Sequence, residues 1–244
     1  MRRLILAGLL VFLGVSRAWA ADVRLLNYYD LPPFLTGQNQ GLTYALASYL
    51  TKKSDGKYTF VVENLPRRRF DAVLAEGKPV AVAWAVPAFV GDKEQAKYKW
   101  SPAVLADANV VVSRKDRPFE YTGPESLAGK TLGGVAGYVY GPIDPLVDAG
   151  KIKREDAATE LLNLRKVTEG RVDATVLAET AANYLIKTEG LSDKLHISAT
   201  PHSKYDRHVF VAGNDPELAD FIAKTVGGMA ADPEWKTASG PFLK

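Results

Sequence analysis

The stretch Val80-Ala81-Val82-Ala83-Trp84-Ala85-Val86 decides the fold class of this chain. It is a continuous apolar run of strand length, which is typical of a strand that helices cover on both faces of a parallel sheet. Helical and β-rich patterns alternate before it, at Val23–Tyr28, Leu42–Leu50, Tyr58–Val62 and Arg67–Glu76. This β-α-β-α-β order predicts a mainly parallel sheet with helical crossovers.

A second unit of the same kind follows the run. Its predicted strands and helices are Val104–Val112, Thr131–Val135, Thr159–Glu169, Val172–Leu177, Thr180–Lys187, His196–Thr200 and Arg207–Ala212. Asp215-Pro216 then predicts the start of a helix to about Ala230, with Asp as the N-cap and Pro in the first helical position. Two units of this type predict two α/β lobes instead of one continuous sheet.

The N-terminal residues have the layout of a secretory signal peptide. Met1-Arg2-Arg3 is basic, Leu4–Val15 is apolar, and Ala18-Trp19-Ala20 matches an A-x-A cleavage site. The apolar run is too short for a membrane span, which needs about 20 residues. We therefore predict a cleavable signal peptide over residues 1–20 and export to the periplasm.

Charge and cysteine content exclude several classes of protein. The predicted signal segment contains three arginines and no acid, so the remaining chain has 28 basic and 28 acidic residues. This balance lacks the basic footprint of a nucleic-acid-binding protein. Cysteine is absent, which excludes disulfides, thiolate metal sites, a cysteine nucleophile and a lipid-anchored cysteine.

Five segments occur in the order and at the spacing of motifs in a known family. They are Tyr29–Phe34 (YDLPPF), Gly41–Leu46 (GLTYAL), Trp100-Ser101-Pro102, Ser126–Gly133 (SLAGKTLG) and Gly170–Ala174 (GRVDA). The chain thus resembles the bacterial periplasmic solute-binding proteins of the amino-acid type, family 3. The resemblance implies the type II periplasmic-binding fold, in which each lobe is a mainly parallel sheet flanked by helices and two crossing strands join the lobes.

The same resemblance implies a domain division and a function. Lobe one would comprise residues 21–107 plus 204–244, and lobe two residues 108–203. The expected function is that of a non-catalytic, monomeric receptor without a cofactor. It would close by hinge motion around a small polar ligand and deliver it to an inner-membrane permease or sensor of an ABC transport system.

Both halves of the family's amino-acid clamp are altered in this chain. The family's arginine for the ligand carboxylate corresponds to Glu94, and its aspartate for the ligand ammonium corresponds to Ala178. A glutamate cannot form the bidentate pair that arginine forms with a carboxylate. A shift of one residue in the alignment would return Lys93 and Glu179 to the two roles, and this alternative stays open.

Candidate ligand contacts follow from the rule that ligands of α/β sheets bind beyond the carboxyl ends of the strands. They are Tyr28, Tyr29, Asp30, Phe34 and Trp84 in lobe one, and Ala136, Gly137, Tyr138, Tyr140, Glu179 and Thr180 in lobe two. Tyr and Trp combine a large apolar face with one polar group, which suits the wall of a binding site. The alternative is that these aromatic residues pack in the lobe cores, as predicted for Tyr44 and Tyr49.

Three consecutive arginines, Arg67-Arg68-Arg69, follow Pro66 at the start of a predicted helix. Cations at a helix N-terminus oppose the helix dipole and need compensation. We predict that Arg69 binds an anionic group of the ligand. The alternative is a solvated basic turn.

The sequence contains no catalytic or metal-binding motif of a known kind. The spacing of His196, His202 and His208 does not favour a metal site, although Tyr205 and Asp206 lie nearby. Two other functions stay open. One is a dehydratase-like enzyme of the same fold, which needs a buried carboxylic acid in the cleft, with Glu179 and Glu94 as candidates. The other is an accessory or sensory protein with a vestigial cleft.

Overall fold

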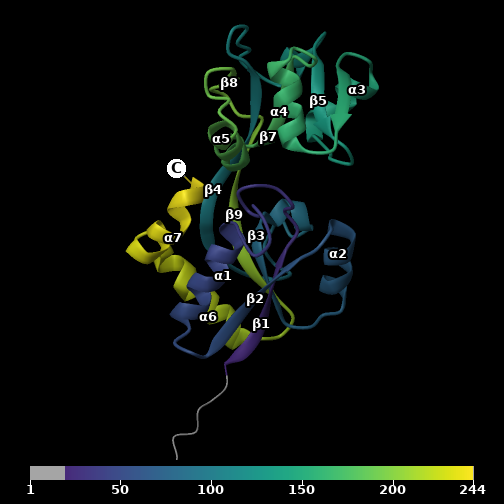
Figure 1. Cartoon of the computed structure of the whole chain (residues 1–244). Coiled ribbons are helices and arrows are strands. Elements are labelled where there is room, and N and C mark those ends of the chain that lie inside the picture. The colour runs from purple at the N-terminus through teal and green to yellow at the C-terminus, as the bar shows by residue number, and fades with distance from the viewer. Residues whose placement is uncertain (1–19, 244) are drawn as a thin grey trace, which may run out of the picture.

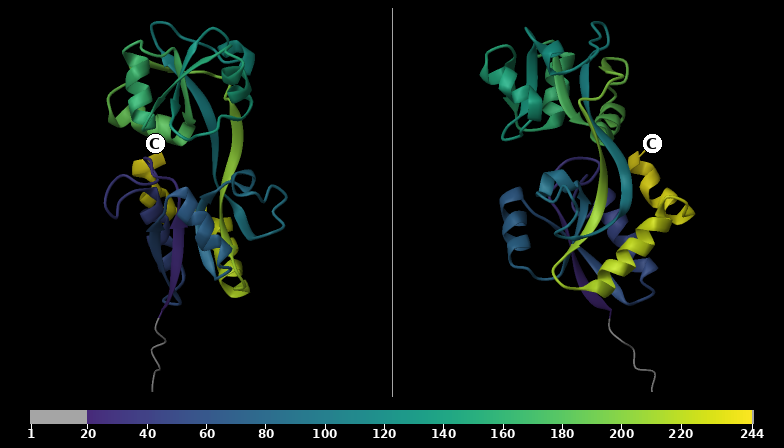
Figure 2. Two further views of the ribbon diagram at one scale, coloured as in Figure 1. Left: turned by 90° about the vertical axis from the view of Figure 1, so that its right-hand side faces the viewer. Right: turned by 180° about the vertical axis from the view of Figure 1, so that it is seen from behind.

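The structure, a computed structural model, describes residues 20–243, which form two α/β lobes (Figure 1). Two long strands, β4 (Lys99–Arg114) and β9 (Ser203–Ala212), run from one lobe into the other and pair along their length. The side and back views of Figure 2 show the same two strands between the lobes. The predicted signal peptide lies outside the described residues, apart from Ala20.

Lobe one contains the parallel strands β1 (Ala21–Asn27), β2 (Tyr58–Asn64) and β3 (Val80–Ala85). The strand order is β2-β1-β3-β9-β4, and β9 runs antiparallel to both of its neighbours. All six residues of β3 are buried. The prediction that this apolar run is a strand covered on both faces is therefore confirmed.

Helices pack on both faces of the lobe-one sheet. One face is covered by α1 (Leu42–Lys53), α6 (Pro216–Met229) and α7 (Pro233–Leu243), and the other by α2 (Arg67–Ala75) and the short 3-10 helix η1 (Pro87–Val90). The residues on β1 alternate accordingly: Leu25 packs toward the α1 side and Leu26 toward the α2 side. The sheet is thus the middle layer of a three-layer lobe.

Lobe two repeats this arrangement around its own strands, but β4 and β9 join the strands of both lobes into one continuous sheet in the described residues, so the expectation that the lobes do not share a sheet is wrong. The strands β5 (Thr131–Val135), β6 (Lys153–Ala157) and β7 (Ala174–Ala178) are parallel, and β4 and β8 (Leu195–Ile197) complete the sheet in antiparallel pairings. The helices are α3 (Asp144–Asp148), α4 (Glu160–Thr168) and α5 (Glu179–Thr188), with 3-10 helices η2 (Pro124–Leu127) and η3 (Gly141–Ile143).

The predicted elements agree well with the structure where the local signal is strong. Asp215 caps α6 by accepting the N–H of Leu218 at 2.9 Å, as predicted. The strand predicted over His196–Thr200 is shorter, and β9 begins at Ser203 instead of Arg207. The helices α3 and α7 and the strand β6 were not predicted from the sequence. The sequence of β6 is charged because it is an edge strand, and such strands lack an apolar pattern.

A further contact between the lobes involves the C-terminal helix. The ring of Tyr184 on α5 lies 6.5 Å from that of Phe242 on α7, so lobe two touches lobe one beside the crossing strands. The predicted lobe boundaries fall within β4 and β9 and stay a prediction. Among residues 20–243 there is no helix whose length and apolar character would let it cross a membrane.

Gly213, at the end of β9, provides a test of this packing. It has φ +76°, and a Cβ atom there would lie 2.6 Å from the backbone nitrogen of Pro79. Gly190 has φ +64° but nothing within 4 Å of its Cβ position. We expect Gly213→Ala to lower the free energy of unfolding by about 2–4 kcal/mol, and the control Gly190→Ala by about 1 kcal/mol, in urea titrations. Equal losses would contradict the close approach.

Candidate functional site

The carboxyl ends of the parallel strands in the two lobes face each other. Tyr29 and Asp30 follow β1 in lobe one, whereas Tyr138 follows β5 and Glu160 begins α4 in lobe two. The negative charge of Asp30 contributes to the raised pKa of the Glu160 carboxyl, and Tyr29 contributes to the raised pKa of Tyr138. These four residues therefore define a candidate site between the lobes.

The predicted aromatic residues of lobe one form a continuous series of ring contacts. Centroid distances are 4.4 Å for Tyr28–Tyr29, 5.2 Å for Tyr29–Phe34 and 5.5 Å for Phe34–Trp84. The two tyrosines are half-buried, whereas Phe34 and Trp84 are fully buried. The rings of Tyr28 and Tyr29 are thus partly accessible. The buried Phe34 packs against Tyr29, and the buried Trp84 packs against Phe34. Direct ligand contact by any of the four stays a prediction.

Trp84 holds an uncommon backbone conformation. Its φ is +60°, which is rare for a bulky residue, and non-glycine residues in this region often occur at functional sites. The pairing of β3 with β9 shifts register between Val82 and Ala85 at this point. The indole donates a hydrogen bond to Thr43 Oγ1 at 2.9 Å. Trp84 is therefore held by both its backbone and its side chain.

A buried arginine lies beneath these aromatic rings. Arg207, on β9, is 1% exposed, and its guanidinium lies 4.4 Å from the ring centroid of Tyr29 and 4.6 Å from that of Phe34. It also lies 5.2 Å from the ring of Tyr205, whose hydroxyl accepts a hydrogen bond from Nη2 at 3.3 Å. Nη1 donates to the carbonyl oxygen of Trp84 at 3.3 Å. Three aromatic rings and the carbonyl oxygen of Trp84 thus lie close to the buried charge.

The partner of this arginine is Asp107 on the other crossing strand. Its Oδ2 lies 2.7 Å from Arg207 Nε, and both side chains are buried. Its Oδ1 accepts the N–H of Thr180, in the first turn of α5, at 3.1 Å. Burial alone lowers the pKa of Arg207, but Tyr29, Tyr205 and Asp107 outweigh it and raise the pKa above its ordinary value. The ion pair therefore links β4 and β9, and it reaches β3 in lobe one and α5 in lobe two.

The three arginines of α2 differ in their contacts. Arg67 Nε lies 2.9 Å from Asp71 Oδ1, Nη2 donates to the carbonyl oxygen of Phe89 at 3.0 Å, and the guanidinium lies 5.4 Å from the Tyr28 ring. Asp71 thus supplies the compensation expected at this helix start. Arg69 is exposed. Its role in anion binding stays a prediction, and Arg67 is the arginine that contacts the aromatic series.

In lobe two, the Gly-rich turn carries Tyr138 toward α4. Gly137 has φ +81°, and the half-exposed Tyr138 follows it. Partial burial and the nearby Glu160 carboxyl raise the pKa of Tyr138. Tyr140, also a candidate, is buried, and its hydroxyl accepts the N–H of Val135 at 2.8 Å. Tyr140 shapes the turn from inside the lobe.

Glu160 is a functional candidate that sequence analysis missed. It is the first residue of α4 and is only 7% exposed. Burial raises the pKa of its carboxyl, and the nearby Asp30 adds to the increase. In the sequence it resembled an ordinary acid in a first helical turn. Recognising β6 directly before α4 would have placed it at the carboxyl edge of the sheet.

The residues at or next to the positions of the family's amino-acid clamp are exposed or half-buried. Glu179 is exposed and lines a pocket of about 290 Å³ beside the crossing strands, together with Asp107 and Lys204. Lys93 and Glu94 lie exposed in a turn, and Ala178 is half-buried at the end of β7. Whether any of them replaces a clamp residue stays a prediction.

A larger pocket, of about 510 Å³, lies beside Asp30 in lobe one. Tyr44 and Asn64 line it, and the Tyr44 hydroxyl accepts a hydrogen bond from Asn64 Nδ2 at 3.1 Å. Tyr44 is half-buried and so differs from Tyr49, which is buried against Trp235 as expected of a packing residue. The pocket extends the candidate site along the loop after β1.

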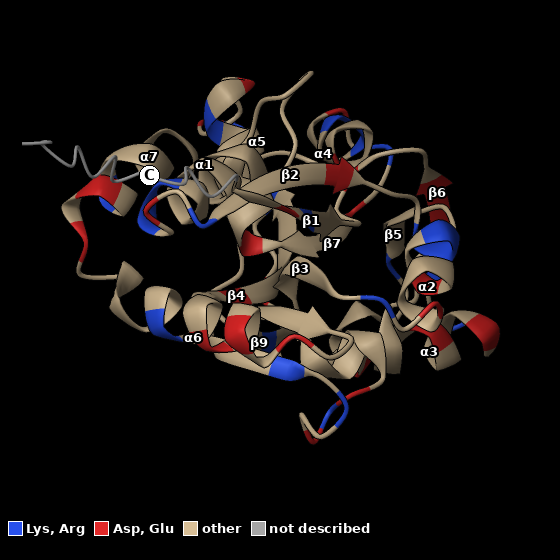
Figure 3. Cartoon of the chain, turned by 90° about the horizontal axis from the view of Figure 1, so that it is seen from below, with Lys and Arg blue, Asp and Glu red and all other residues tan. Residues whose placement is uncertain are grey.

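The three histidines lie apart and have separate partners. His196 Nε2 lies 2.6 Å from Glu120, His202 Nδ1 lies 3.0 Å from the Tyr121 hydroxyl, and His208 Nδ1 lies 3.0 Å from the Ser101 carbonyl oxygen. Within residues 20–243, no three His, Asp or Glu side chains gather closely enough to hold a metal ion together. In the view of Figure 3, basic and acidic residues are interspersed along the chain.

The buried ion pair leads to a stability prediction. Asp107→Asn removes the negative charge and leaves Arg207 buried and unpaired, so we expect the free energy of unfolding to fall by about 3–5 kcal/mol in urea titrations. The double variant Asp107→Leu/Arg207→Met removes both charges and should regain much of this loss. A loss below about 1 kcal/mol in the single variant, the value of an exposed pair, would contradict the assignment.

Glu160 leads to a pH-dependent prediction. Because its folded-state pKa is raised, the native protein keeps this proton at pH values where the unfolded chain has lost it. The resulting stability is full below the ordinary carboxyl pKa and is lost as the pH rises through the folded-state pKa. Glu160→Gln stays neutral, so its melting temperature should exceed that of the parent at neutral pH.

The gain from Glu160→Gln should shrink as the pH approaches about 4, where the parent's carboxyl is also neutral. The exposed Glu94→Gln serves as the control and should show no such gain at either pH. If Glu160→Gln melted below the parent at neutral pH, the carboxylate would be stabilised by its surroundings in the folded protein. The claim that burial destabilises its charged form would then be wrong.

Comparison with known proteins gives structural matches only. No family model and no curated protein matches the sequence. An ancestral arginine-binding protein bound to arginine is similar, with a TM-score of 0.70 and 17% identity over 93% of this chain and 100% of that one. A structure from work on glutathione import via GshT and the cystine ABC importer TcyBC of Streptococcus mutans has a TM-score of 0.69 and 19% identity, covering 92% and 95%.

A third similar structure is an ancestral amino-acid-binding protein described as a precursor of cyclohexadienyl dehydratase. Its TM-score is 0.68 at 17% identity, and the match covers 92% of this chain and 96% of that one. At such low identity the agreement concerns the fold, and it extends over both lobes of each protein. The chain therefore has the two-lobed type II fold of periplasmic solute-binding proteins.

Proposed function

We propose that this protein is a periplasmic solute-binding receptor that closes its two lobes around a small polar ligand. It would deliver this ligand, as a monomer, to an inner-membrane transporter or sensor. The observation that carries the proposal is the opposition of Tyr29 and Asp30 in lobe one to Tyr138 and Glu160 in lobe two. Solved structures of the same fold that bind amino acids support it.

The charges around the site favour a ligand with both signs of charge. Asp30 and the carboxyl of Glu160 would attract a cationic group, which the rings of Tyr29 and Tyr138 would also stabilise from their faces. Arg69 lies on α2, the helix whose first residue, Arg67, packs on Tyr28, and it would bind an anionic group. The ligand would thus be held by contacts that replace the family's altered clamp.

Ligand binding would favour closure through contacts that exist only when the lobes meet. A ligand held between Tyr29 and Tyr138 touches both lobes at once, so its affinity for the closed form exceeds that for the open form. Bending would take place in β4 and β9, because these strands run between the lobes.

One observation favours a second candidate function, an enzyme of the same fold. Such an enzyme needs a buried carboxylic acid with a raised pKa in the cleft, and Glu160 has both properties, whereas Glu179 and Glu94 are exposed. One of the similar structures is a precursor of a dehydratase. Glu160 would act as the general acid, and Glu160→Gln would then abolish turnover of a substrate that still binds.

The receptor proposal is tested first by a thermal-shift screen of refolded, ligand-free protein. The screen covers amino acids, amines, small carboxylates and sugars, and refolding removes any ligand retained during purification. A ligand at 100 times its Kd should stabilise the protein by about 2.7 kcal/mol, and the melting temperature should rise accordingly. The absence of a shift from every class would favour an accessory protein with a vestigial cleft.

Arg69→Ala tests the anion contact on a ligand found in that screen. We expect the Kd of an anionic ligand to rise by roughly tenfold or more, because a hydrogen bond to a charged group contributes about 1.5–3 kcal/mol. The melting temperature of the empty protein should stay within about 2 °C, since Arg69 is exposed. Calorimetry measures the Kd, and the neighbouring Arg68→Ala is the matched control. An unchanged Kd would refute this role of Arg69.

A further inference from the structure

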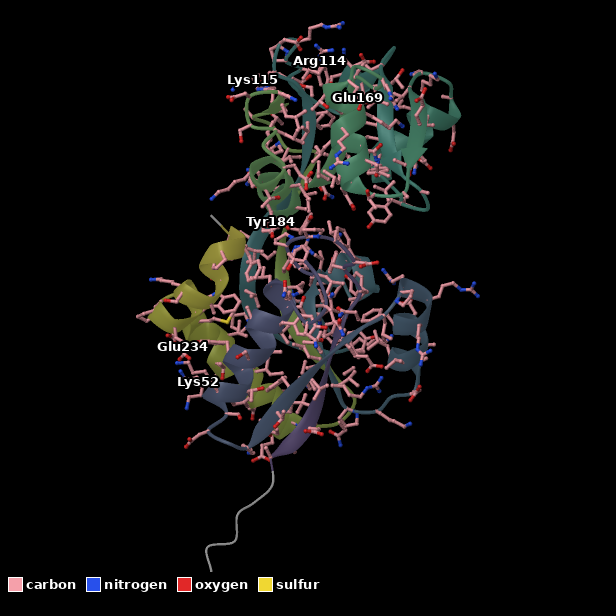
Figure 4. All side chains as sticks on the ribbon, in the orientation of Figure 1. Lys52, Arg114, Lys115, Glu169, Tyr184 and Glu234 are labelled. Carbon is pink, nitrogen blue, oxygen red and sulfur yellow. The ribbon has the colours of Figure 1, made fainter. Side chains whose placement is uncertain are left out.

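We propose a second binding site, for a small organic carboxylate, at the end of lobe two that lies away from lobe one. A pocket of about 320 Å³ opens there, a volume within the range of small-molecule sites. Its cationic lining residues are Arg114, Arg117 and Lys130, and its apolar ones include Phe119 and Val172. Figure 4 labels Arg114 and, close to it, Glu169 at this end of the lobe.

The topology separates this pocket from the site between the lobes. Arg114 is the last residue of β4, Lys130 directly precedes β5, and Val172 precedes β7. Because β4 runs antiparallel to β7, its end meets the beginnings of β5 and β7 at one edge of the sheet. Tyr138 follows the opposite end of β5. The pocket and the interlobe site therefore lie at opposite edges.

The acidic residues around the pocket already have partners. Asp116 Oδ1 accepts a hydrogen bond from Arg114 Nε at 2.7 Å, and Asp173 Oδ2 accepts the N–H of Thr131 at 2.7 Å. Glu169 pairs with Arg171 at 2.9 Å.

Two cations of the pocket lining, Arg117 and Lys130, have no carboxylate partner among the described residues. Within the part of the chain that the structure describes, neither forms an ion pair within 4.0 Å, although both line the pocket. The lining thus has three cations and a single carboxylate, that of Asp173, which is engaged by a backbone N–H. An incoming anion would meet an excess of positive charge.

The apolar part of the lining indicates which anion fits. Lys130 Nζ lies 4.6 Å from the ring centroid of Phe119, and Val172 is only 2% exposed. A carboxylate with an apolar body would lie against the half-buried Phe119 while its oxygens reach Arg117 and Lys130. Gly170, which also lines the pocket, lies close to Arg114, since a Cβ atom there would lie 2.9 Å from Arg114 Nη1.

An NMR titration of the ¹⁵N-labelled protein with benzoate tests the site. We expect the amide signals of Gly170 and Asp173 to shift and to saturate with a Kd of about 1 mM or tighter. Benzamide, which has the same shape without the charge, should leave them unchanged. Higher salt should weaken benzoate binding, because the cations are partly exposed.

Variants decide whether the named cations carry the binding. The double variant Arg117→Met/Lys130→Met should raise the benzoate Kd by roughly tenfold or more. Lys115→Met is the matched control, because Lys115 donates to the Ser192 carbonyl oxygen at 3.2 Å and does not line the pocket. The proposal would be wrong if benzoate gave no saturable shift, if the double variant bound it equally well, or if the shifts mapped to Tyr29 and Tyr138.

Discussion

The ion pair between Arg207 and Asp107 is the interaction on which the arrangement of both lobes depends. It is buried where β4 and β9 pass between the lobes, with Nε and Oδ2 separated by 2.7 Å. Removing two charges from water costs several kcal/mol each, which only good geometry and further hydrogen bonds offset. Here the carbonyl oxygen of Trp84 and the N–H of Thr180 supply those bonds. The pair therefore joins elements of lobe one, lobe two and both connections.

The same guanidinium positions the candidate binding surface. Tyr29 and Phe34 lie against it at 4.4 Å and 4.6 Å, so these two rings pack on a charged group that cannot move without leaving the buried Asp107 unpaired. A cation beneath an aromatic ring stabilises it by about 2 kcal/mol or more when water is excluded. The rings that face the interlobe site are thus held rigidly, which lowers the entropy cost of binding a ligand between them.

The raised pKa of the buried Glu160 carboxyl is relevant to both the receptor and the enzyme hypothesis. Burial and the charge of Asp30 make the Glu160 carboxyl less stable as an anion, and either a ligand cation or proton transfer to a substrate would use that property. The receptor is favoured because the contacts of the site consist of opposed aromatic and charged groups from two lobes. The pocket at the far edge of lobe two adds cations that take no part in either scheme.

Sequence alone determined the α/β class, the order of most elements and the two-lobed division, because apolar periodicity and the Asp215 cap act over a few residues. It also identified the residues after β1 and β5 as site candidates, since strand ends are local features. Only the tertiary structure paired Arg207 with Asp107, which are 100 residues apart, and brought Glu160 opposite Asp30. Such pairings depend on which elements pack together, and no spacing along the chain encodes a contact between two lobes.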